Sequence, residues 1–322
     1  MVTTRRRDRA QMILIGALAL AVLIIGVSVV ANSAYVTDVD TTSEVSPQID
    51  EAQEFEYEAN KGVRSLILRL NHRHRNLTDD KFGTIVGRNV TVYSQLLAES
   101  YTSSHGHYAS ITYNNGSSAY GSRVVQAKDF YIKDEGNNTG SWDIGDDSEY
   151  RELGWFSMNV ELEQTRQEQL SITVSNASGN QVAFEINRTD TSNGTKLRVV
   201  SDVSHAGETT ALCDPSRNRV LLDFVDGETF TGDCAFNGTR AVGGPVRIHV
   251  DGGENVVGKY EVVYNDSVGS SEYSDCDSSP TPDATEPCAA PVVWEANVTT
   301  EFAGSQLNYT NTFNVSVYEE TP

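Results

Sequence analysis

The sequence predicts an α+β fold in which an N-terminal transmembrane helix precedes an antiparallel helical hairpin and an all-β antiparallel sandwich. Three observations predict it. Residues 12–31 form an uncharged apolar run, apolar residues then recur at spacings of three and four as far as about residue 103, and polar and apolar residues alternate from His107 onward. We expect the chain to divide into a basic cytoplasmic leader at 1–10, a transmembrane helix at 11–34, a juxtamembrane link at 35–46, a helical hairpin at 47–104 and an extracellular β-sandwich domain at 105–322.

The first element is a candidate membrane anchor. A helix over residues 12–31, at about 1.5 Å per residue, spans roughly 30 Å, the thickness of the hydrocarbon core of a bilayer. Four arginines precede this run and three acidic residues, Asp38, Asp40 and Glu44, follow it. By the positive-inside rule we expect a single-pass protein with a cytoplasmic N-terminus and an extracellular C-terminal domain, with the lipid bilayer as a partner. A cleaved secretory signal fits less well, because its apolar core is only about 7 to 15 residues long.

The next two elements are predicted helices. Ser46 and Pro47 suit the N-cap and the first helical position. The apolar residues that follow at helical spacing predict an amphipathic helix from about 47 to 74: Ile49, Ala52, Phe55, Ala59, Val63, Leu66, Ile67 and Leu70. A turn at 76–80 then leads into a second such helix that reaches about Ser103. Two helices joined by so short a turn should pack antiparallel as a hairpin.

The rest of the chain is predicted to consist of short strands. Turn signals such as Asn114-Asn-Gly116, Ser192-Asn-Gly194 and Asp251-Gly-Gly253 separate stretches rich in β-branched and aromatic residues, a pattern typical of an antiparallel sandwich. The first expected strand starts at His107, and a further short strand covers 129–134. The others are expected at 155–162, 169–174, 181–186, 196–200, 219–225, 246–250, 256–264, 292–302 and 307–318. We expect a Gly/Asp/Asn loop at 137–149 and an extended loop at 274–291. The tryptophans Trp142, Trp155 and Trp294 are expected in the sandwich core.

Four cysteines, Cys213, Cys234, Cys276 and Cys288, all fall in the part predicted to lie outside the cell. An even number of cysteines in an oxidising compartment indicates two disulfides. Three pairings are open, and we favour the nearest-neighbour one, Cys213 with Cys234 and Cys276 with Cys288. No C-x-x-C or Cys/His spacing for zinc is present.

The charge balance excludes one class of partner. The 322 residues contain 24 basic and 45 acidic side chains, a formal net charge of −21, and this negative charge would repel a nucleic acid. Arginine outnumbers lysine 18 to 6. Acid excess with scarce lysine resembles proteins of salt-loving archaea, in which molar salt shortens the Debye length to about 3 Å and screens self-repulsion. An ordinary acidic secreted protein is the alternative.

Sequons for N-linked glycans are abundant, which favours an extracellular domain that carries sugar. The alternative is a Thr/Asn-rich β-surface that contains such triplets by chance. The twelve candidate asparagines are Asn76, Asn89, Asn115, Asn137, Asn176, Asn187, Asn193, Asn237, Asn265, Asn297, Asn308 and Asn314.

The sequence shows no pattern of a catalytic, metal or cofactor site. The pairs His72/His74 and His105/His107 are expected at opposite ends of the second helix, too far apart to share a metal. The acidic clusters at 143–147, 251–254 and 275–277 do not fit the calcium loop of an EF-hand and are expected to be solvated turns. Nucleophile-elbow, zinc-protease and phosphate-loop motifs are absent. We therefore expect no enzyme; a surface hydrolase with paired carboxylates is the least favoured alternative.

The segment Arg9-Ala10-Gln11, directly before the apolar run, resembles the class III (prepilin-type) signal of archaeal pilins and archaellins, which implies cleavage between Ala10 and Gln11. Together with the segments 30–35 and 246–263, it makes the chain similar to a haloarchaeal family of pilin-like membrane-anchored surface proteins. The resemblance implies a surface or pilus-associated location, partnership with other pilin-like subunits, and adhesion or assembly without catalysis. Ile15 stands where bacterial-type pilins carry glutamate. Two alternatives are therefore an uncleaved anchor and a solitary anchored module that binds a ligand or an envelope glycan.

Overall fold

The computed structural model describes residues 46–73, 79–145, 149–231, 234–267, 273–276, 285–305 and 307–318. The chain divides into two units, Met1–Pro47 and Gln48–Pro322. All described residues except the first two of helix α2 belong to the second unit. The leader and apolar run predicted at 1–34 lie outside the described residues.

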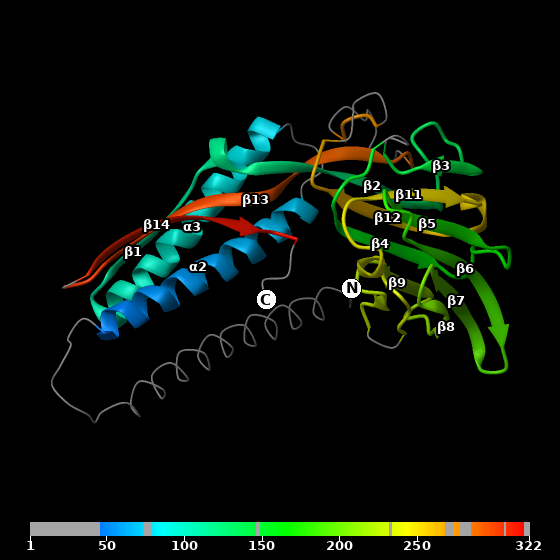
Figure 1. Ribbon diagram of the computed structural model, residues 1–322, viewed down its shortest axis with the longest axis horizontal. Coiled ribbons are helices and arrows are strands. Elements are labelled where there is room, and N and C mark those ends of the chain that lie inside the picture. The colour runs from blue at the N-terminus through cyan, green and yellow to red at the C-terminus, as the bar shows by residue number, and fades with distance from the viewer. Residues whose placement is uncertain are drawn as a thin grey trace, which may run out of the picture. The chain divides into compact units, whose positions relative to one another are not determined.

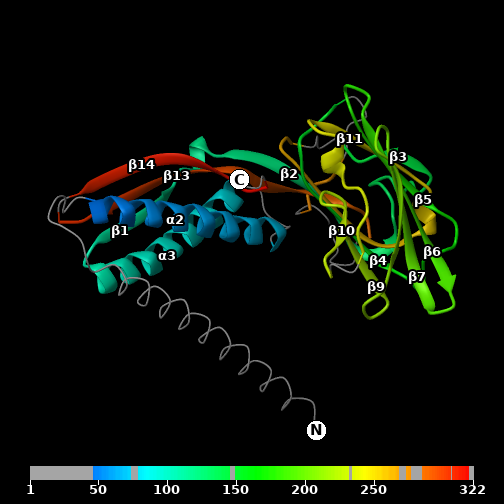
Figure 2. The same cartoon turned by 60° about the horizontal axis from the view of Figure 1, so that its bottom comes forward.

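Two long helices cover one part of the larger sheet. They are α2 (Ser46–Arg73) and α3 (Asp79–His105). Their apolar residues recur at helical spacing, and the fully buried ones include Phe55, Val63 and Ile67 of α2. These side chains pack in one core with residues of β1 (Tyr108–Tyr113), β13 (Cys288–Ala303) and β14 (Asn308–Ser316). Figures 1 and 2 show α2 and α3 lying against this part of the sheet.

The larger sheet is antiparallel and has the strand order β1-β13-β2-β12-β4-β9-β10, with β14 paired to β13. Its long central strand β13 pairs with β2 through residues 288–295 and with β1 and β14 through residues 295–303. One continuous sheet therefore serves both the helical core and the sandwich. Its remaining strands are β2 (Ala119–Tyr131), β12 (Val257–Tyr264), β4 (Leu153–Glu161), β9 (Arg219–Asp223) and β10 (Glu228–Thr229).

The smaller sheet is also antiparallel, with the order β3-β11-β5-β6-β7-β8. Its strands are β3 (Ser141–Asp143), β11 (Val246–Asp251), β5 (Leu170–Asn176), β6 (Gln181–Thr191), β7 (Gly194–Val203) and β8 (Gly207–Cys213). Three short 3-10 turns, Asn115–Ser117, Thr239–Ala241 and Gly253–Asn255, complete the described elements.

The two sheets pack face to face as a β-sandwich-like fold. Alternate residues of each strand point into the shared core, as the period of two requires. Phe156 of β4 stacks on Phe224 with ring centroids 4.5 Å apart, and Phe184 of β6 meets Phe224 edge-on at 5.0 Å. This aromatic cluster joins the two sheets at the centre of the sandwich.

The fold class predicted from the sequence is wrong. Neither helix of the described chain is long and apolar enough to cross a membrane. The two helices also do not form an N-terminal hairpin domain of their own, because their apolar faces pack on β1, β13 and β14 of the larger sheet. Helical periodicity located the helices well, but it carries no information about which surface an apolar face will cover. The described chain is mainly two antiparallel sheets with two helices packed on one of them.

Both pairs of cysteines form disulfides. Cys213 at the end of β8 is bonded to Cys234, and Cys276 is bonded to Cys288 at the start of β13. This is the nearest-neighbour pairing that the sequence analysis favoured. Cys213 and Cys234 are buried in the sandwich core, whereas the second bond closes the segment before β13.

Candidate functional site

The outer face of the larger sheet carries the polar residues of the sandwich strands. In β4 the side chains of Phe156, Met158 and Val160 enter the core, so the alternate residues Trp155, Ser157 and Asn159 point to the outer face. The same alternation in β12 places Lys259 and Glu261 outward between the buried Tyr260 and Val262. Arg123 and Val125 of β2 and Leu221 of β9 extend this face on either side.

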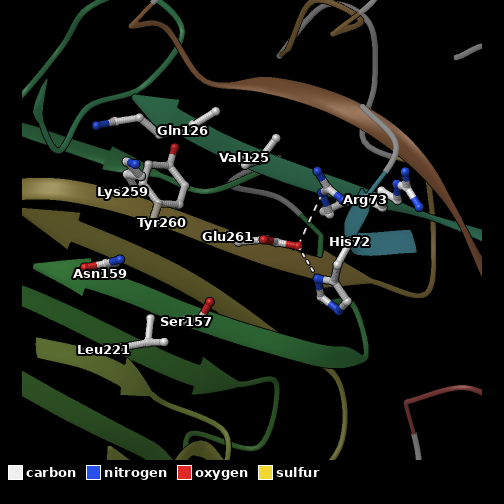
Figure 3. A pocket seen from close by; sticks show the side chains of 12 residues that line it. His72, Arg73, Val125, Gln126, Ser157, Asn159, Leu221, Lys259, Tyr260 and Glu261 are labelled. Carbon is white, nitrogen blue, oxygen red and sulfur yellow. Dashed lines mark hydrogen bonds and ion pairs between the residues drawn. The ribbon is translucent and has the colours of Figure 1, made fainter. Parts of the chain in front are cut away.

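A pocket of about 310 Å³ lies on this face, where α2 ends against the sheet. Its volume falls at the lower end of the range for small-molecule sites, about 300–1,000 Å³. Figure 3 shows side chains from α2, β2, β4, β9 and β12 around it. The lining residues are His72, Arg73, Arg123, Val125, Gln126, Ala127, Ser157, Asn159, Leu221, Lys259, Tyr260 and Glu261.

A buried ion pair forms one wall of the pocket. The guanidinium of Arg123 is only 1% exposed, and its Nε lies 3.3 Å from Oε1 of Glu261. Arg123 also donates a hydrogen bond to the carbonyl oxygen of Asn71 near the end of α2. The Nδ1–H of His72 donates to the same Glu261 oxygen at 2.5 Å, because a carboxylate can only accept. These contacts fix the end of α2 on β12, and Figure 3 draws the two that Glu261 makes.

A second ionic network borders the pocket on the same face. Arg219 of β9 donates two hydrogen bonds to Asp129, at 2.8 and 2.9 Å, and a third to Glu161 at 3.1 Å. Nζ of Lys259 lies 3.4 Å from Oδ2 of Asp129, which also accepts one of the hydrogen bonds from Arg219. The hydrogen bonds from Arg219 hold the pKa of Asp129 below its usual value. Asp129 is therefore ionised at neutral pH and keeps this border ordered.

The pocket inverts the charge balance of the chain. Its lining residues include three Lys or Arg side chains and one carboxylate, a formal net charge of +2, whereas the whole chain carries −21. Arg123 is buried against Glu261, whereas Arg73 is exposed and Lys259, which pairs with Asp129, is 38% exposed. Arg73 and Lys259 are therefore the two lining cations that an anion from solvent could reach. An anionic group would meet fewer repelling carboxylates here than over the chain as a whole.

Apolar side chains gather next to these cations. Trp155 packs against His72 with ring centroids 5.0 Å apart and against Phe230 at 5.5 Å. Phe230 is 47% exposed and Leu221 is 38% exposed. The indole Nε1–H of Trp155 donates to Ser157 at 3.0 Å, which fixes the ring beside the hydroxyl. Aromatic surface beside hydroxyl, amide and cationic groups can contact both the apolar face and the polar substituents of a sugar.

The structure places only some of the residues singled out in the sequence. Arg9, Ala10 and Gln11 lie outside the described residues, as do Asn76 and His74. Trp142 is buried in the sandwich core as expected. Trp155 lies instead on the outer face, and Trp294 packs on Tyr318 at 5.3 Å outside that core.

The sequons differ in how far their asparagines are accessible. Those of Asn115, Asn137, Asn193, Asn308 and Asn314 are exposed, and the other six described are partly covered. Asn176 is the most constrained: its Oδ1 accepts from two backbone amides, and its Nδ2 donates to the carbonyl oxygens of Val242 and Gly243 at 2.8 and 3.0 Å. A sugar on this Nδ2 would displace one of those bonds.

A Ser-His-Asp contact occurs on β3 and β11. His249 Nδ1 lies 3.1 Å from Asp143, and its Nε2 lies 3.2 Å from the hydroxyl of Ser141. The same Nε2 also lies 3.1 Å from Asp251, and His249 is 40% exposed. A nucleophilic serine requires a histidine base that has no competing partner and is shielded from water. His249 meets neither condition, so this arrangement does not support hydrolysis. Among the described residues, no group of three His, Cys, Asp or Glu side chains could hold a metal ion.

The sequence analysis missed the pocket for a specific reason. The alternation in β4 and β12 was visible, but the strand that contributes Arg123 was not predicted. The contact between the end of α2 and β12 joins residues 189 positions apart, and no local pattern encodes it. Comparison with models of known protein families, with curated proteins and with solved structures finds no match.

Proposed function

We propose that this protein is an exported cell-surface protein whose β-sandwich binds an acidic glycan on the outer face of its larger sheet. The observation that carries the proposal is the pocket whose lining includes Arg73, Lys259 and the exposed Leu221. At its edge Trp155 packs on the lining residue His72, and the exposed Phe230 packs on Trp155. Carboxylated sugars combine an apolar ring face with an anionic group. The apolar side chains can contact the ring face, and the cations can bind the carboxylate. The proposed activity is binding without catalysis.

The location at the cell surface is part of the same proposal. The two disulfides favour an oxidising compartment, and the arginine-rich leader before the apolar run at 12–31 favours retention at the cell membrane with the C-terminal domain outside. The acid excess favours a salt-rich, haloarchaeal setting, and the sequons favour a glycoprotein. In molar salt, attraction between charges that are not in direct contact is screened. A ligand must therefore form direct hydrogen bonds with the cations, and a pocket provides these better than a broad charged surface.

A polyuronate offers a direct test of the ligand. The full-length protein is titrated with polygalacturonate and, as a matched neutral polymer, with its methyl ester, which differs only in the masked carboxylates. We expect the acid form to bind at least about tenfold more tightly, equal to about 1.4 kcal/mol. Equal binding to the two polymers would remove the proposal.

A pair of variants locates the site. Replacing both Arg73 and Lys259 by Gln should reduce the affinity for the polyuronate about tenfold. Replacing both Arg198 on β7 and Arg247 on β11 by Gln removes two cations from the other sheet and serves as the matched control. If the control loses as much affinity as the variant at Arg73 and Lys259, the binding is a general charge effect rather than a property of this pocket.

A second candidate function is a subunit of a type IV pilus-like assembly that contributes to adhesion. The segment Arg9-Ala10-Gln11 before the apolar run favours it. Sheared filaments from native cells should then contain the protein, and its mature N-terminus should be Gln11. A mature chain that begins at Met1 and stays with the membrane fraction would leave the solitary binding module.

A further inference from the structure

A lysine, an asparagine and a glutamate meet in the segment after β2. Lys133 donates a hydrogen bond to Oδ1 of Asn137, and the Nδ2–H of Asn137 donates to Oε1 of Glu286 at 3.3 Å. We propose that Lys133 and Asn137 join in an intramolecular isopeptide bond, with Glu286 transferring the proton. The inference is independent of the proposed glycan site.

The environment of Lys133 is unusual for a lysine. Its side chain is 2% exposed, although lysine is among the residues that are almost never fully buried unless paired. Its Nζ lies 4.7 Å from the ring centre of Phe130 and donates to the hydroxyl of Thr285 at 3.0 Å. In the part of the chain that the structure describes, these partners of Nζ and the amide oxygen of Asn137 are all neutral, so an ammonium here is buried without a carboxylate beside it. Conversion of the amine to a neutral amide would remove that cost.

The backbone holds both reacting groups in place. The backbone N–H of Lys133 donates to Gln126 at 3.3 Å, and its carbonyl accepts from the hydroxyl of the buried Tyr260 at 3.1 Å. Asn137 adopts a left-handed conformation with φ of 63°, and its N–H donates to the carbonyl of Asp134 at 3.3 Å. The turn therefore holds the carboxamide of Asn137 next to the amine of Lys133, four residues earlier. Because the two reacting groups are already positioned, little entropy is lost when they react.

The reaction balances without a further reagent. The unprotonated Nζ of Lys133 attacks Cγ of Asn137 and forms a new C–N bond. In the tetrahedral intermediate both nitrogens are bonded to Cγ, so the attacking nitrogen comes within reach of Glu286, which is already hydrogen-bonded to Nδ2. Glu286 then accepts a proton from the attacking nitrogen and delivers it to Nδ2. The bond from Cγ to Nδ2 then breaks and ammonia leaves. The products are one secondary amide and one ammonia, and Glu286 is regenerated.

Mass spectrometry of a tryptic digest of the full-length chain tests the bond. An acylated Lys133 is no longer a trypsin site, so residues 129–151 should appear as one peptide that has lost one ammonia. A cyclic imide on an asparagine also loses ammonia, but it leaves the cut after Lys133. Recovery of separate peptides 129–133 and 134–151, with Asn137 intact, deamidated, cyclised or glycosylated, would overturn the proposal.

Two variants tie the bond to its chemistry. Glu286→Gln keeps the size of the side chain but cannot move a proton, and Lys133→Arg keeps the cation and the trypsin site. Both should show no loss of ammonia, whereas the disulfide between Cys276 and Cys288 in the same digest reports that the segment has folded. A cross-link that forms as completely in Glu286→Gln as in the wild type would contradict the proposed role of Glu286.

Discussion

His72 Nδ1 lies 2.5 Å from Glu261 Oε1, and this contact joins the end of α2 to the outer face of the sandwich. The same carboxylate faces the guanidinium of Arg123, which is buried. One acidic side chain therefore neutralises a buried cation and docks a helix. The pocket depends on both effects, because His72 and Arg123 form one of its walls.

Glu261→Gln should lower the free energy of unfolding by about 2–3 kcal/mol, because it removes the carboxylate that lies 3.3 Å from the buried guanidinium of Arg123. The value lies toward the low end for a buried pair, since Glu261 itself is partly exposed. Urea unfolding followed by circular dichroism measures it. Glu208→Gln on the exposed face of β8 is the control and should change stability by less than about 0.5 kcal/mol. Equal stability of the two variants would show that Arg123 does not need Glu261.

Arg219→Gln should have an effect that depends on pH. The pKa of Asp129 is lower in the folded protein than the ordinary value of 3.8, because Arg219 donates hydrogen bonds to its carboxylate. A group with a lowered folded-state pKa stabilises the fold above the unfolded pKa, and this contribution is lost as the pH falls through the folded pKa. The variant should therefore be less stable than the wild type by about 1 kcal/mol at pH 7. In urea titrations from pH 7 to pH 2, that difference should shrink below about pH 4; a constant difference would contradict the assignment.

Gly62→Ala tests the packing of α2 on α3. A Cβ at Gly62 would overlap the hydroxyl oxygen and Cζ of Tyr93, so the ring must move and lose its hydrogen bond to the carbonyl oxygen of Glu58. We expect a net loss of about 1–2 kcal/mol in the free energy of unfolding, after the helix preference of alanine is counted.

Gly87→Ala is the matched control in α3. Its Cβ would meet only Tyr113 at 3.6 Å, an ordinary contact. This variant should gain up to about 1 kcal/mol, the helix preference of alanine over glycine. Thermal unfolding should show a loss of stability for Gly62→Ala and a gain for Gly87→Ala, which would support the packing of α2 on α3. A gain of stability in both variants would contradict it.

Glycopeptide mapping of the protein from native membranes should separate the sequons by accessibility. Asn193 and Asn308 are exposed, and we expect sugar there. Asn176 should be bare, because its amide group makes four hydrogen bonds that fix the turn after β5. A glycan on Asn176 together with bare Asn193 and Asn308 would contradict the account of the surface.

Local signals were enough to locate most elements. Helical spacing predicted α2 and α3 to within a few residues, and alternation located strands such as β4, β5 and β11. Besides the two-residue strand β10, three strands were missed for physical reasons. Residues 121–126 of β2 are all buried, because both faces of the strand are covered there. They include the polar Ser122, Arg123 and Gln126, so no alternation of polar and apolar residues marks the strand. β3 lies in a Gly/Asn/Asp segment, and β8 is rich in threonine and glutamate without clear alternation.

The assembly of these elements was not predictable from the same signals. Pro291 indicated a loop, yet it lies within β13 opposite Ser122. The pocket combines α2 with strands that are distant in the chain. Arginine is usually exposed, so residue type alone would have placed Arg123 on the surface, whereas it is buried. Long-range pairing determined the site, whereas the sequence analysis resolved only local periodicity.

The most direct measurement is a hydrogen-exchange map of the full-length protein with and without saturating polygalacturonate. If the outer face of the larger sheet binds acidic sugar, amides of β4 and β12 and of the last turn of α2 should exchange more slowly with the polymer present, and those of β6 and β7 should not change. Protection confined to the smaller sheet, or none at a concentration that saturates binding, would contradict the central claim.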